Sequence, residues 1–180
     1  CPKHRLQTRS PNFHSIIFSF NHPALKTRSY DKEIMDEFGL GGEAMAQTLR
    51  ELRFINRWLG GNAVTLQGLD SLLPKAGANG TALEIADLGC GGGDMLVLMS
   101  HWARRRRLPV RFTGVDANDY TINYARRHTA RYPEISYAHL NVFSPEFQAQ
   151  RYDVITCTLF CHHFTDDELI ALFRSLKQQV

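Results

Sequence analysis

The stretch of sequence that decides the fold is IADLGCGGGD, residues 85–94. It begins inside a short apolar run, Leu83 to Leu88, of the kind that forms a buried parallel strand. The glycines that follow permit a sharp turn whose backbone can approach a ligand closely. A helix is expected to begin near Asp94. This order of strand, glycine turn and helix predicts a nucleoside site at the end of the strand.

A second apolar run, RFTGVD at residues 111–116, ends in the carboxylate of Asp116. In nucleotide-binding sheets, an acidic residue at the end of the next strand accepts hydrogen bonds from the ribose hydroxyls. Because the carboxyl ends of parallel strands meet at one edge of a sheet, we expect the glycine turn and Asp116 to bind the same ligand.

The spacing of the glycines distinguishes between kinds of nucleoside ligand. The dinucleotide pattern G-x-G-x-x-G, counted from Gly89, requires a glycine at the position where this chain has Asp94. The chain carries D-x-G-x-G-x-G instead, from Asp87 through Gly89, Gly91 and Gly93. No Lys or Arg lies in the turn to meet a pyrophosphate, so a ligand without phosphate fits better.

Length and composition are those of one folded domain. The chain has 180 residues, of which 43% are hydrophobic, enough for a hydrophobic core. No apolar run approaches the roughly 18 residues of a membrane-spanning helix. The net charge of +3 is uneven, because residues 1–30 carry five Lys or Arg and no acid, whereas the rest is slightly acidic. The body therefore has no charge signature of nucleic-acid binding.

Cysteine usage favours a reducing compartment. The cysteines at positions 1, 90, 157 and 161 lack the paired spacing of a secreted, disulfide-rich domain, so a cytoplasmic location is expected. Cys157, Cys161, His162 and His163 are close enough in sequence to raise the question of a zinc site. No second pair of ligands lies nearby, and we therefore expect no metal.

Two segments precede the nucleoside domain. Residues 1–29 are basic and lack periodicity, which predicts an extended or disordered arm, and an acid-free start is also compatible with a targeting peptide. Residues 30–80 are expected to form a helical cap, because apolar residues recur at helical spacing from Ala44 to Leu59 before the stop Gly60-Gly61-Asn62. This cap either packs on the sheet or also covers the cofactor and lines a substrate pocket.

From residue 81 onward, strands and helices alternate, as a doubly wound α/β sheet requires. The run of four arginines at 104–107 lies at an expected helix end, where cations complement the helix dipole. The predicted elements are a strand at 83–88, a helix at 94–107, a strand at 110–116, a helix at 119–131, strands at 135–140 and 152–159, and a helix at 166–178.

Three features together resemble the class I S-adenosylmethionine-dependent methyltransferases. They are the glycine turn, Asp116 at its spacing, and Tyr152–Phe164, where a His-His-Phe segment follows a strand as in motif IV of that family. The segment NRWLGG, residues 56–61, is similar to a leader segment of small bacterial members. The resemblance covers about residues 27–178. It implies a Rossmann-like three-layer sandwich with strand order 3-2-1-4, an N-terminal helical cap, and S-adenosylmethionine as the cofactor.

The resemblance also implies which residues hold the cofactor. Asp116 takes the place of the ribose-binding acid, whereas Asn141 stands where the family usually has an acid that binds adenine. An amide oxygen can still accept a hydrogen bond, although without charge, and a loop asparagine is the alternative interpretation. The expected cofactor contacts are Arg28, Tyr30, Asp87, Gly89, Cys90, Gly91, Gly93, Asp116, Ala117, Asn141, Val142, Thr158 and Leu159.

The methionyl carboxylate and the proton of the acceptor need partners of their own. Arg28, Tyr30 and Arg57 are candidates for the carboxylate, although surface arginine and packed tyrosine are common. His162 or His163 is the candidate catalytic base, since histidine exchanges protons near neutral pH. For each of them, a histidine that only bonds a loop carbonyl is the alternative.

The sheet of the resembling family has seven strands, whereas this sequence ends after the helix that follows the fourth. We expect a truncated sheet whose strand 152–159 is an apolar edge, open to pairing with a second copy or another partner. Three functions then compete: methyl transfer to a small-molecule acceptor, cofactor binding by a non-catalytic scaffold, and, less favoured, NAD-dependent oxidation.

Overall fold

The computed structural model describes residues 41–58, 61–73 and 81–180. All of them belong to the second of the two compact units of the chain, Lys32–Val180. The expected arm at 1–29, with Arg28 and Tyr30, lies outside the described residues, as do parts of the expected cap. Of that cap, the structure describes two helices, α1 (Gly42–Trp58) and α2 (Gly61–Leu72).

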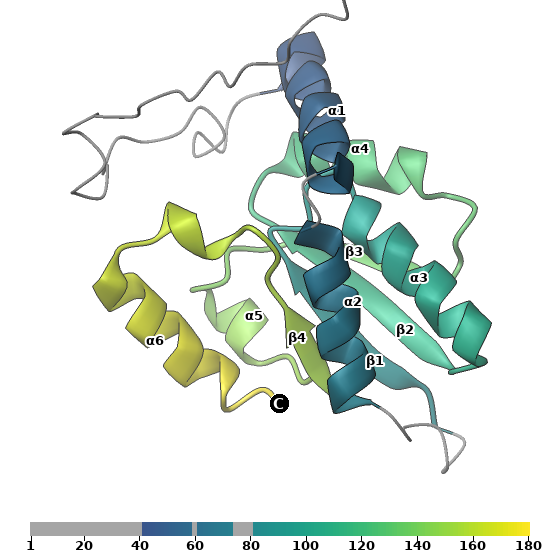
Figure 1. The fold of residues 1–180 in the computed structure, drawn as a ribbon. Coiled ribbons are helices and arrows are strands. Elements are labelled where there is room, and N and C mark those ends of the chain that lie inside the picture. The colour runs from purple at the N-terminus through teal and green to yellow at the C-terminus, as the bar shows by residue number, and fades with distance from the viewer. Residues whose placement is uncertain (1–40, 59–60, 74–80) are drawn as a thin grey trace, which may run out of the picture. The chain divides into compact units, whose positions relative to one another are not determined.

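A four-stranded parallel sheet lies at the centre of the described part (Figure 1). Its strands are β1 (Leu83–Leu88), β2 (Val110–Asp116), β3 (Ile135–His139) and β4 (Val154–Thr156). β1 pairs with β2 along its whole length, from Leu83 opposite Val110 to Leu88 opposite Val115. The strand order is β3-β2-β1-β4, which confirms the predicted order 3-2-1-4.

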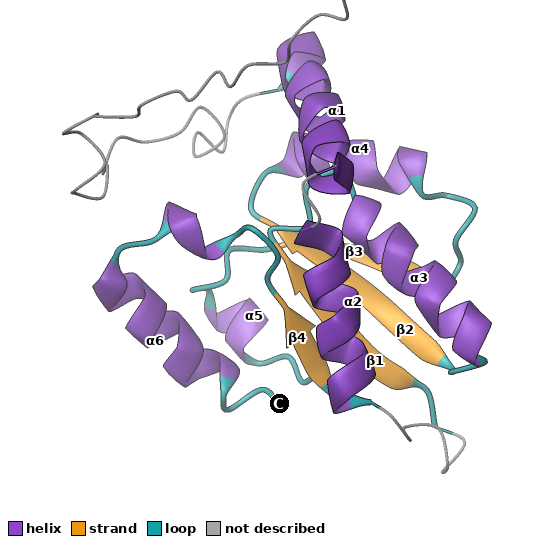
Figure 2. Ribbon diagram, in the orientation of Figure 1, coloured by secondary structure: helices purple, strands orange, loops and turns teal. Residues whose placement is uncertain are grey.

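Helices cover both faces of the sheet and make three layers (Figure 2). α2, α3 (Asp94–Arg106) and α4 (Asp119–His128) lie on one face, and α5 (Pro145–Gln148) and α6 (Asp166–Leu176) lie on the other. Successive side chains of a strand point to opposite faces. Accordingly, Ile85 of β1 packs with the first group of helices, and Ala86 and Leu88 pack with the second. The predicted α/β sandwich is confirmed.

Most predicted elements differ from the observed ones only at their ends. The strands predicted at 83–88 and 110–116 have the predicted bounds, and the strand predicted at 135–140 ends at His139. The helices predicted at 94–107, 119–131 and 166–178 end at Arg106, His128 and Leu176.

The predicted strand 152–159 is wrong in its length. β4 contains only Val154–Thr156, because the chain turns at Thr158 and Leu159, where Leu159 has a positive φ of 55°. A 3-10 helix, Cys161–His163, follows this turn and is not predicted by the sequence pattern. The apolar edge expected along 152–159 is therefore limited to the 3 residues of β4.

One helix, α5, is missing from the sequence prediction, and another, α2, belongs to the predicted cap at 30–80 but begins where a helix stop is predicted. α5 begins after Ser144, whose side chain accepts a hydrogen bond from the Phe147 amide, and its single turn is too short to show an apolar period. α2 begins at Gly61, inside the segment that the sequence predicts as a helix stop. Glycine is tolerated at a helix N-terminus, and the apolar contact of Leu69 with the core decides in favour of a helix.

Helix ends agree with the local signals in the sequence. The predicted capping box is present, because Thr165 Oγ1 accepts from the Glu168 amide at 3.3 Å and Glu168 Oε2 accepts from the Thr165 amide at 2.7 Å. The last turn of α3 carries Arg104–Arg106, as predicted. Arg104 also donates two hydrogen bonds to Glu134, at 2.7 and 2.9 Å, which join α3 to the segment before β3.

The two N-terminal helices pack on the domain through different contacts. α1 contributes Met45 and Leu49 to a small apolar cluster with Tyr124 of α4. α2 contacts α3, where the Trp102 indole N–H donates to Asp70 at 2.5 Å. Both helices therefore lie on the α3 and α4 face of the sheet.

Candidate functional site

The first loop of the site follows β1 and consists of residues 89–93, the glycine turn. Gly89, Gly91 and Gly93 have positive φ angles of 63°, 50° and 80°, which glycine adopts without strain. The amide of Cys90 donates a hydrogen bond to the Val115 carbonyl of β2 at 3.1 Å. The glycine turn is therefore bound to the strand that carries the neighbouring acid.

Two of these glycines make room for aromatic side chains of the protein. A Cβ atom at position 89 would lie 2.2 Å from the Phe160 ring, and one at position 93 would lie 2.2 Å from the Tyr137 hydroxyl. At Gly91, a Cβ atom would meet only Leu49, at 3.8 Å. Packing inside the protein thus explains part of the glycine pattern, and Gly91 is the position that leaves backbone open.

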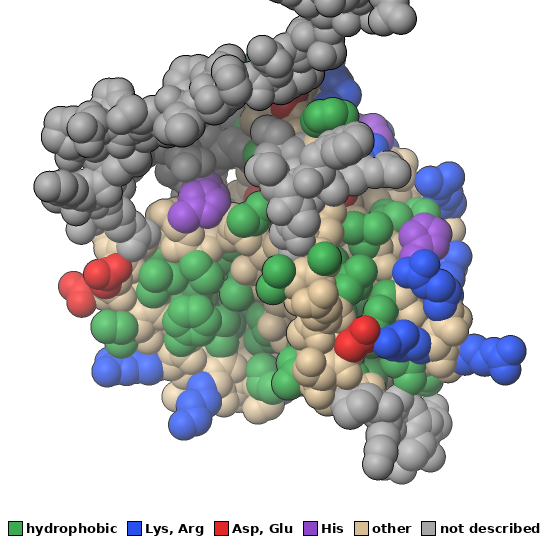
Figure 3. All heavy atoms as spheres, viewed as in Figure 1, with side chains coloured by type: hydrophobic (Ala, Val, Ile, Leu, Met, Phe, Trp, Pro, Cys, Tyr) green, Lys and Arg blue, Asp and Glu red, His purple; other side chains and the backbone are tan. Residues whose placement is uncertain are grey.

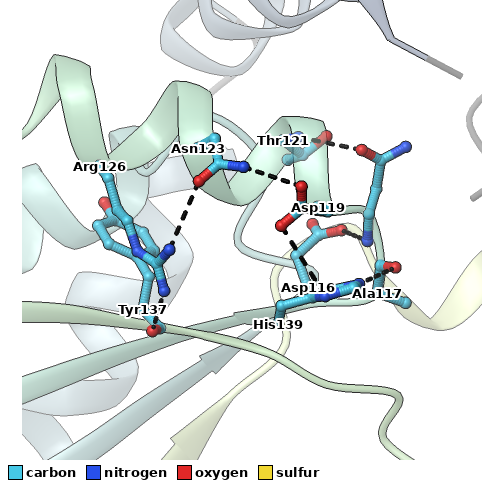
Figure 4. A network of polar contacts seen from close by, with 9 residues as sticks. Asp116, Ala117, Asp119, Thr121, Asn123, Arg126, Tyr137 and His139 are labelled. Atoms are coloured by element: carbon cyan, nitrogen blue, oxygen red, sulfur yellow. Dashed lines mark hydrogen bonds and ion pairs between the residues drawn. The ribbon is translucent and has the colours of Figure 1, made fainter. Parts of the chain in front are cut away.

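Figure 4 shows the Asp116 carboxylate at the carboxyl end of β2. The Gly91 amide donates to Oδ2 at 3.2 Å, and the Asn118 amide donates to Oδ1 at 2.9 Å. Burial raises the pKa of Asp116, and these two hydrogen bonds oppose that rise. Each carboxylate oxygen keeps a further lone pair, so Asp116 can still accept hydrogen bonds from two hydroxyl groups.

One histidine beside Asp116 carries no motif signal in the sequence. His139 ends β3, and its Nε2 lies 3.0 Å from the Ala117 carbonyl oxygen (Figure 4). Its Nδ1 lies 3.9 Å from Asp119, and its charge opposes the rise in the pKa of Asp116. Its position at the carboxyl end of the third strand is the only signal that could have found it, because all parallel strands end at the same edge.

Asp87 connects the first strand to the fourth. It is only 3% exposed, and the Thr156 hydroxyl of β4 donates to its carboxylate at 2.7 Å. Burial raises the pKa of Asp87 to about 7, the Thr156 hydrogen bond opposes the rise, and the nearby Asp116 adds to it. The carboxyl group of Asp87 therefore keeps its proton to a higher pH than an exposed carboxyl group does.

The segment after β3 places Asn141 at the surface and Val142 in the core. Asn141 Oδ1 accepts a hydrogen bond from the Phe143 amide at 2.9 Å, the geometry of an asparagine turn. Its amide oxygen keeps one lone pair for another donor. The residue thus has a local structural role that does not exclude contact with a ligand.

The second loop of the site, residues 157–164, follows β4. The rings of His162 and His163 lie 4.0 Å apart, and the Phe160 ring packs against Phe164 at 4.8 Å. His163 is close enough to Asp116 for its charge to oppose the rise in the pKa of that carboxyl. His163, one of the two candidate bases, therefore acts electrostatically on Asp116, the ribose-binding candidate.

A groove of about 430 Å³ lies between α2 and β4. Thr65 of α2 and Thr158 approach each other in it, with 2.6 Å between their hydroxyl oxygens. Leu159 is 56% exposed and belongs to the same groove. Figure 3 shows hydrophobic side chains gathered on this face, over α6 and the neighbouring β4. Thr158 and Leu159, predicted to contact the cofactor, thus line an apolar groove.

α1, which packs against α4, also contacts the glycine turn and the start of α3. Arg53 Nε lies 2.7 Å from Asp94 Oδ1, and Asp94 is the first residue of α3. Leu49 lies over Gly91, as its 3.8 Å approach shows. The side chain of Arg57, a candidate for the methionyl carboxylate, lies outside the part whose side chains are described.

The fold and the site together define a class of protein. A parallel sheet of order 3-2-1-4, a glycine turn after its first strand and a carboxylate after its second are those of a Rossmann-like, nucleoside-binding domain. Residues 85–180 match the family described as methyltransferase domain, and the chain belongs to this family.

Solved methyltransferase structures share this fold at low sequence identity. The plantazolicin methyltransferase BpumL in complex with SAH is 24% identical, with a TM-score of 0.51 over 76% of this chain and 48% of that chain. The DszA carbon methyltransferase is 19% identical, with a TM-score of 0.54 over 66% of this chain and 32% of that chain. The CurJ carbon methyltransferase is 16% identical, with a TM-score of 0.56 over 66% and 31%.

The chain spans less than half the length of each of these structures. No curated protein matches the sequence. The similarity to solved structures therefore establishes the fold, and the family match establishes the family through residues 85–180.

Proposed function

We propose that the chain binds S-adenosylmethionine where β1 and β2 end and acts in methyl transfer to a small-molecule acceptor. The observation that carries this proposal is the hydrogen bond from the Gly91 amide to Asp116. This bond joins a turn of positive-φ glycines to a partly buried carboxylate, the pair that a nucleoside needs for close backbone approach and for its ribose hydroxyls. Membership of the methyltransferase domain family supports it.

The residues present fit this cofactor. Asp116 has lone pairs left for the ribose hydroxyls, and the partly buried Ala117 offers apolar contact to the adenine ring. Val142 has its side chain in the core, so it offers the ring its backbone only. Asn141 keeps a free acceptor position for the adenine amino group after its bond to the Phe143 amide. When bound, the cofactor supplies a methyl group that its positive sulfur already activates.

The remaining work of the protein is positioning and exclusion of water. The groove of Thr158 and Leu159 is an apolar place for the acceptor, adjacent to the second loop. His163, or its neighbour His162, takes up the proton of an acceptor that must lose one. An acceptor that is already anionic needs no base, so the short list of candidate catalytic residues suffices.

An NAD-dependent oxidoreductase is the weaker alternative, for a reason that the structure sharpens. A dinucleotide places its pyrophosphate at the N-terminus of the helix after the glycine turn. In this chain Asp94 is the first residue of that helix, and its carboxylate pairs with Arg53. A carboxylate at this position repels a pyrophosphate, whereas a methionyl nucleoside brings no phosphate to it.

The expected partners follow from the same features. A small molecule suits the apolar groove better than a nucleic acid does, because the body of the chain carries no basic surplus. Within the described residues, no helix is long and apolar enough to cross a membrane. The free thiols of Cys90, Cys157 and Cys161 agree with a cytoplasmic location. A second copy or a partner that pairs with the edge of β4 remains part of the proposal.

Calorimetric titration with S-adenosylhomocysteine and, separately, with NAD tests the proposal. S-adenosylhomocysteine is expected to bind and NAD is not. Asp116→Ala is expected to weaken S-adenosylhomocysteine about tenfold or more, because hydrogen bonds to a charged group are lost. The matched control is Asp167→Ala, which removes an exposed carboxylate from the first turn of α6 and should leave the affinity unchanged. Binding of NAD alone would overturn the proposal.

Methyl transfer itself needs a separate measurement. Incubation with methyl-labelled S-adenosylmethionine and a panel of phenols, acids and enolisable ketones should label at least one acceptor. Cofactor binding without any labelled product would identify a non-catalytic scaffold instead.

A further inference from the structure

Two thiols face each other across the second loop of the site. Cys157 follows directly after β4, and Cys161 is the first residue of the 3-10 helix. Their sulfur atoms lie 3.9 Å apart, with the Cys161 thiol directed at the Cys157 sulfur. Both side chains are only partly buried, unlike Cys90 in the glycine turn.

The backbone between the two cysteines explains the short distance. The chain reverses at Thr158 and Leu159, and the positive φ of 55° at Leu159 makes the turn tight. Leucine is a rare choice for this conformation, which brings the Cβ atom too close to the following carbonyl oxygen. The fold therefore holds the two thiols together against a local preference of the chain.

We infer that Cys157 and Cys161 form a reversible disulfide and make the second loop a thiol-modification site. The oxidant is a peroxide. One thiol is oxidised by hydrogen peroxide to a sulfenic acid with release of one water, and the second thiol displaces the hydroxyl as another water while the sulfur–sulfur bond forms. Two electrons and two protons leave the thiols and reduce the peroxide. A dithiol reductant reverses the reaction by exchange.

The two thiols share one environment. Burial raises the pKa of the Cys157 thiol, and the neighbouring Cys161 adds to the rise. The thiolate is the form that attacks a peroxide, so formation of the bond should be faster at alkaline pH than at neutral pH.

The bond would disturb both loops of the site. Disulfide sulfurs lie about 2.05 Å apart, so the two sulfurs must approach by roughly 2 Å. Phe160, which packs on Gly89, and His163, whose charge acts on Asp116, lie in the same loop and are expected to shift with it. This consequence rests on the proposed function: the oxidised form should bind S-adenosylmethionine less well than the reduced form.

Peptide mass analysis tests the disulfide without reference to any cofactor. Trypsin cleaves after Arg151 and Arg174, so one peptide carries both cysteines. After peroxide treatment and alkylation under denaturing conditions, this peptide should have lost two hydrogens and resist alkylation at both positions. The peptide with Cys90 is the internal reference and should be alkylated fully. Alkylation of Cys157 and Cys161 despite peroxide would overturn the inference.

Calorimetry then tests the effect on the site. Oxidation should weaken S-adenosylhomocysteine about fivefold or more, the lower end of ordinary coupling between sites, and reductant should restore the affinity. Cys157→Ser and Cys161→Ser should each keep the reduced-form affinity after peroxide treatment. Equal affinity of the oxidised and reduced wild-type forms would overturn the effect on the site. Failure of the reduced protein to bind would count against the proposed function, while the peptide masses still decide the disulfide.

Discussion

The two loops at the carboxyl edge of the sheet are held in opposite ways. The glycine turn, residues 89–93, is fixed by backbone amides: that of Cys90 donates to β2 and that of Gly91 donates to Asp116. The second loop, residues 157–164, is fixed mainly by side chains, through its aromatic stack, its hydroxyl contact with α2 and its thiol pair.

This difference bears on how each loop can change. Backbone hydrogen bonds in a turn that only glycine tolerates leave one conformation, which suits a site that must recognise an unvarying nucleoside. Side-chain contacts around a strained leucine permit more than one arrangement, which suits a loop that must accept a substrate or respond to an oxidant. Substitutions in the two loops should therefore have effects on stability that differ in magnitude and in physical cause.

The largest effect is expected in the glycine turn. Gly93→Ala would place a Cβ atom 2.2 Å from the Tyr137 hydroxyl and 3.1 Å from Thr129, at a φ of 80°. Tyr137 cannot move away easily, because its hydroxyl bonds Thr129 and its ring packs on Gly114. We expect a loss of about 3 kcal/mol or more in the free energy of unfolding, measured by urea denaturation.

Gly68→Ala is the matched control for this substitution. Gly68 lies inside α2, and a Cβ atom there meets nothing within 4 Å. Alanine should stabilise the helix by roughly 0.5–1 kcal/mol. Equal urea midpoints for the two variants would show that the glycine turn accommodates a side chain at position 93 and is not more rigid than the second loop.

The second prediction concerns Asp87, which joins the strands that lead into the two loops. Its pKa is raised from an ordinary value of 3.8 to about 7, so between these values the folded protein keeps a proton that the unfolded chain has lost. Stability must therefore fall as pH rises through this window. Asp87→Asn removes the titration, and its amide oxygen can still accept from Thr156. The variant should gain a few kcal/mol relative to wild type by pH 8.

Urea denaturation at a series of pH values checks this prediction. The difference between variant and wild type should be small near pH 4, grow up to pH 7 and then level off. Asp153→Asn is the comparison variant, at the exposed residue before β4, and should not produce this rise. A constant difference in stability between pH 4 and pH 7 would mean that Asp87 is ionised throughout this range. The carboxyl group would then not have the raised pKa that its burial between β1 and β4 predicts.

The third prediction addresses the strain in the second loop. Leu159→Gly should raise the free energy of unfolding by up to about 1 kcal/mol, because glycine accepts the positive φ and the 56% exposed leucine side chain loses little burial. Leu159→Asn should be intermediate and Leu159→Val should be the least stable, since β-branched residues tolerate this conformation worst. A valine variant as stable as the glycine variant would show that the turn is not strained.

The fold was largely predictable because its signals are local. The apolar run of β1, the glycines and Asp116 lie close together in sequence, and Thr165 with Glu168 marks a helix start over four residues. β4 was not predictable in length, because residues 157–159 are as apolar as a strand. The turn there follows from tertiary contacts, the packing of Phe160 on Gly89 and the bond of Thr158 to Thr65.

The candidate site shows the same division. Asp116 and the glycine turn could be named from spacing alone, whereas His139 and Arg53 reach the site only through strand order and helix packing. Asn141 could be named as well, but its bond to the Phe143 amide depends on the turn that it makes. The spacing of residues in the sequence therefore predicts site residues that lie close together along the chain. It misses residues such as His139 and Arg53, which another strand or helix brings to the site.

The smallest effect is expected where α1 covers the glycine turn. Arg53 and Asp94 lie 2.7 Å apart, but both are partly exposed, at 56% and 30%. A double-mutant cycle with Arg53→Ala and Asp94→Asn should give a coupling of about 0.5 kcal/mol that decreases with added salt. Asp94→Asn alone should cost more than Arg53→Ala alone, because it also removes a charge that the N-terminus of α3 favours.

The pair Arg50–Glu43 of the same helix sets the scale for this measurement. It has the same 2.7 Å separation but joins two residues of α1 at 51% and 82% exposure, so its coupling should be the smaller of the two. A coupling above about 2 kcal/mol for Arg53 and Asp94 would mean that charge holds α1 against the first loop. A small value would mean that the apolar contacts of Met45 and Leu49 hold α1 against the glycine turn. Side-chain packing would then cover both loops, whereas backbone hydrogen bonds fix the conformation of the glycine turn alone.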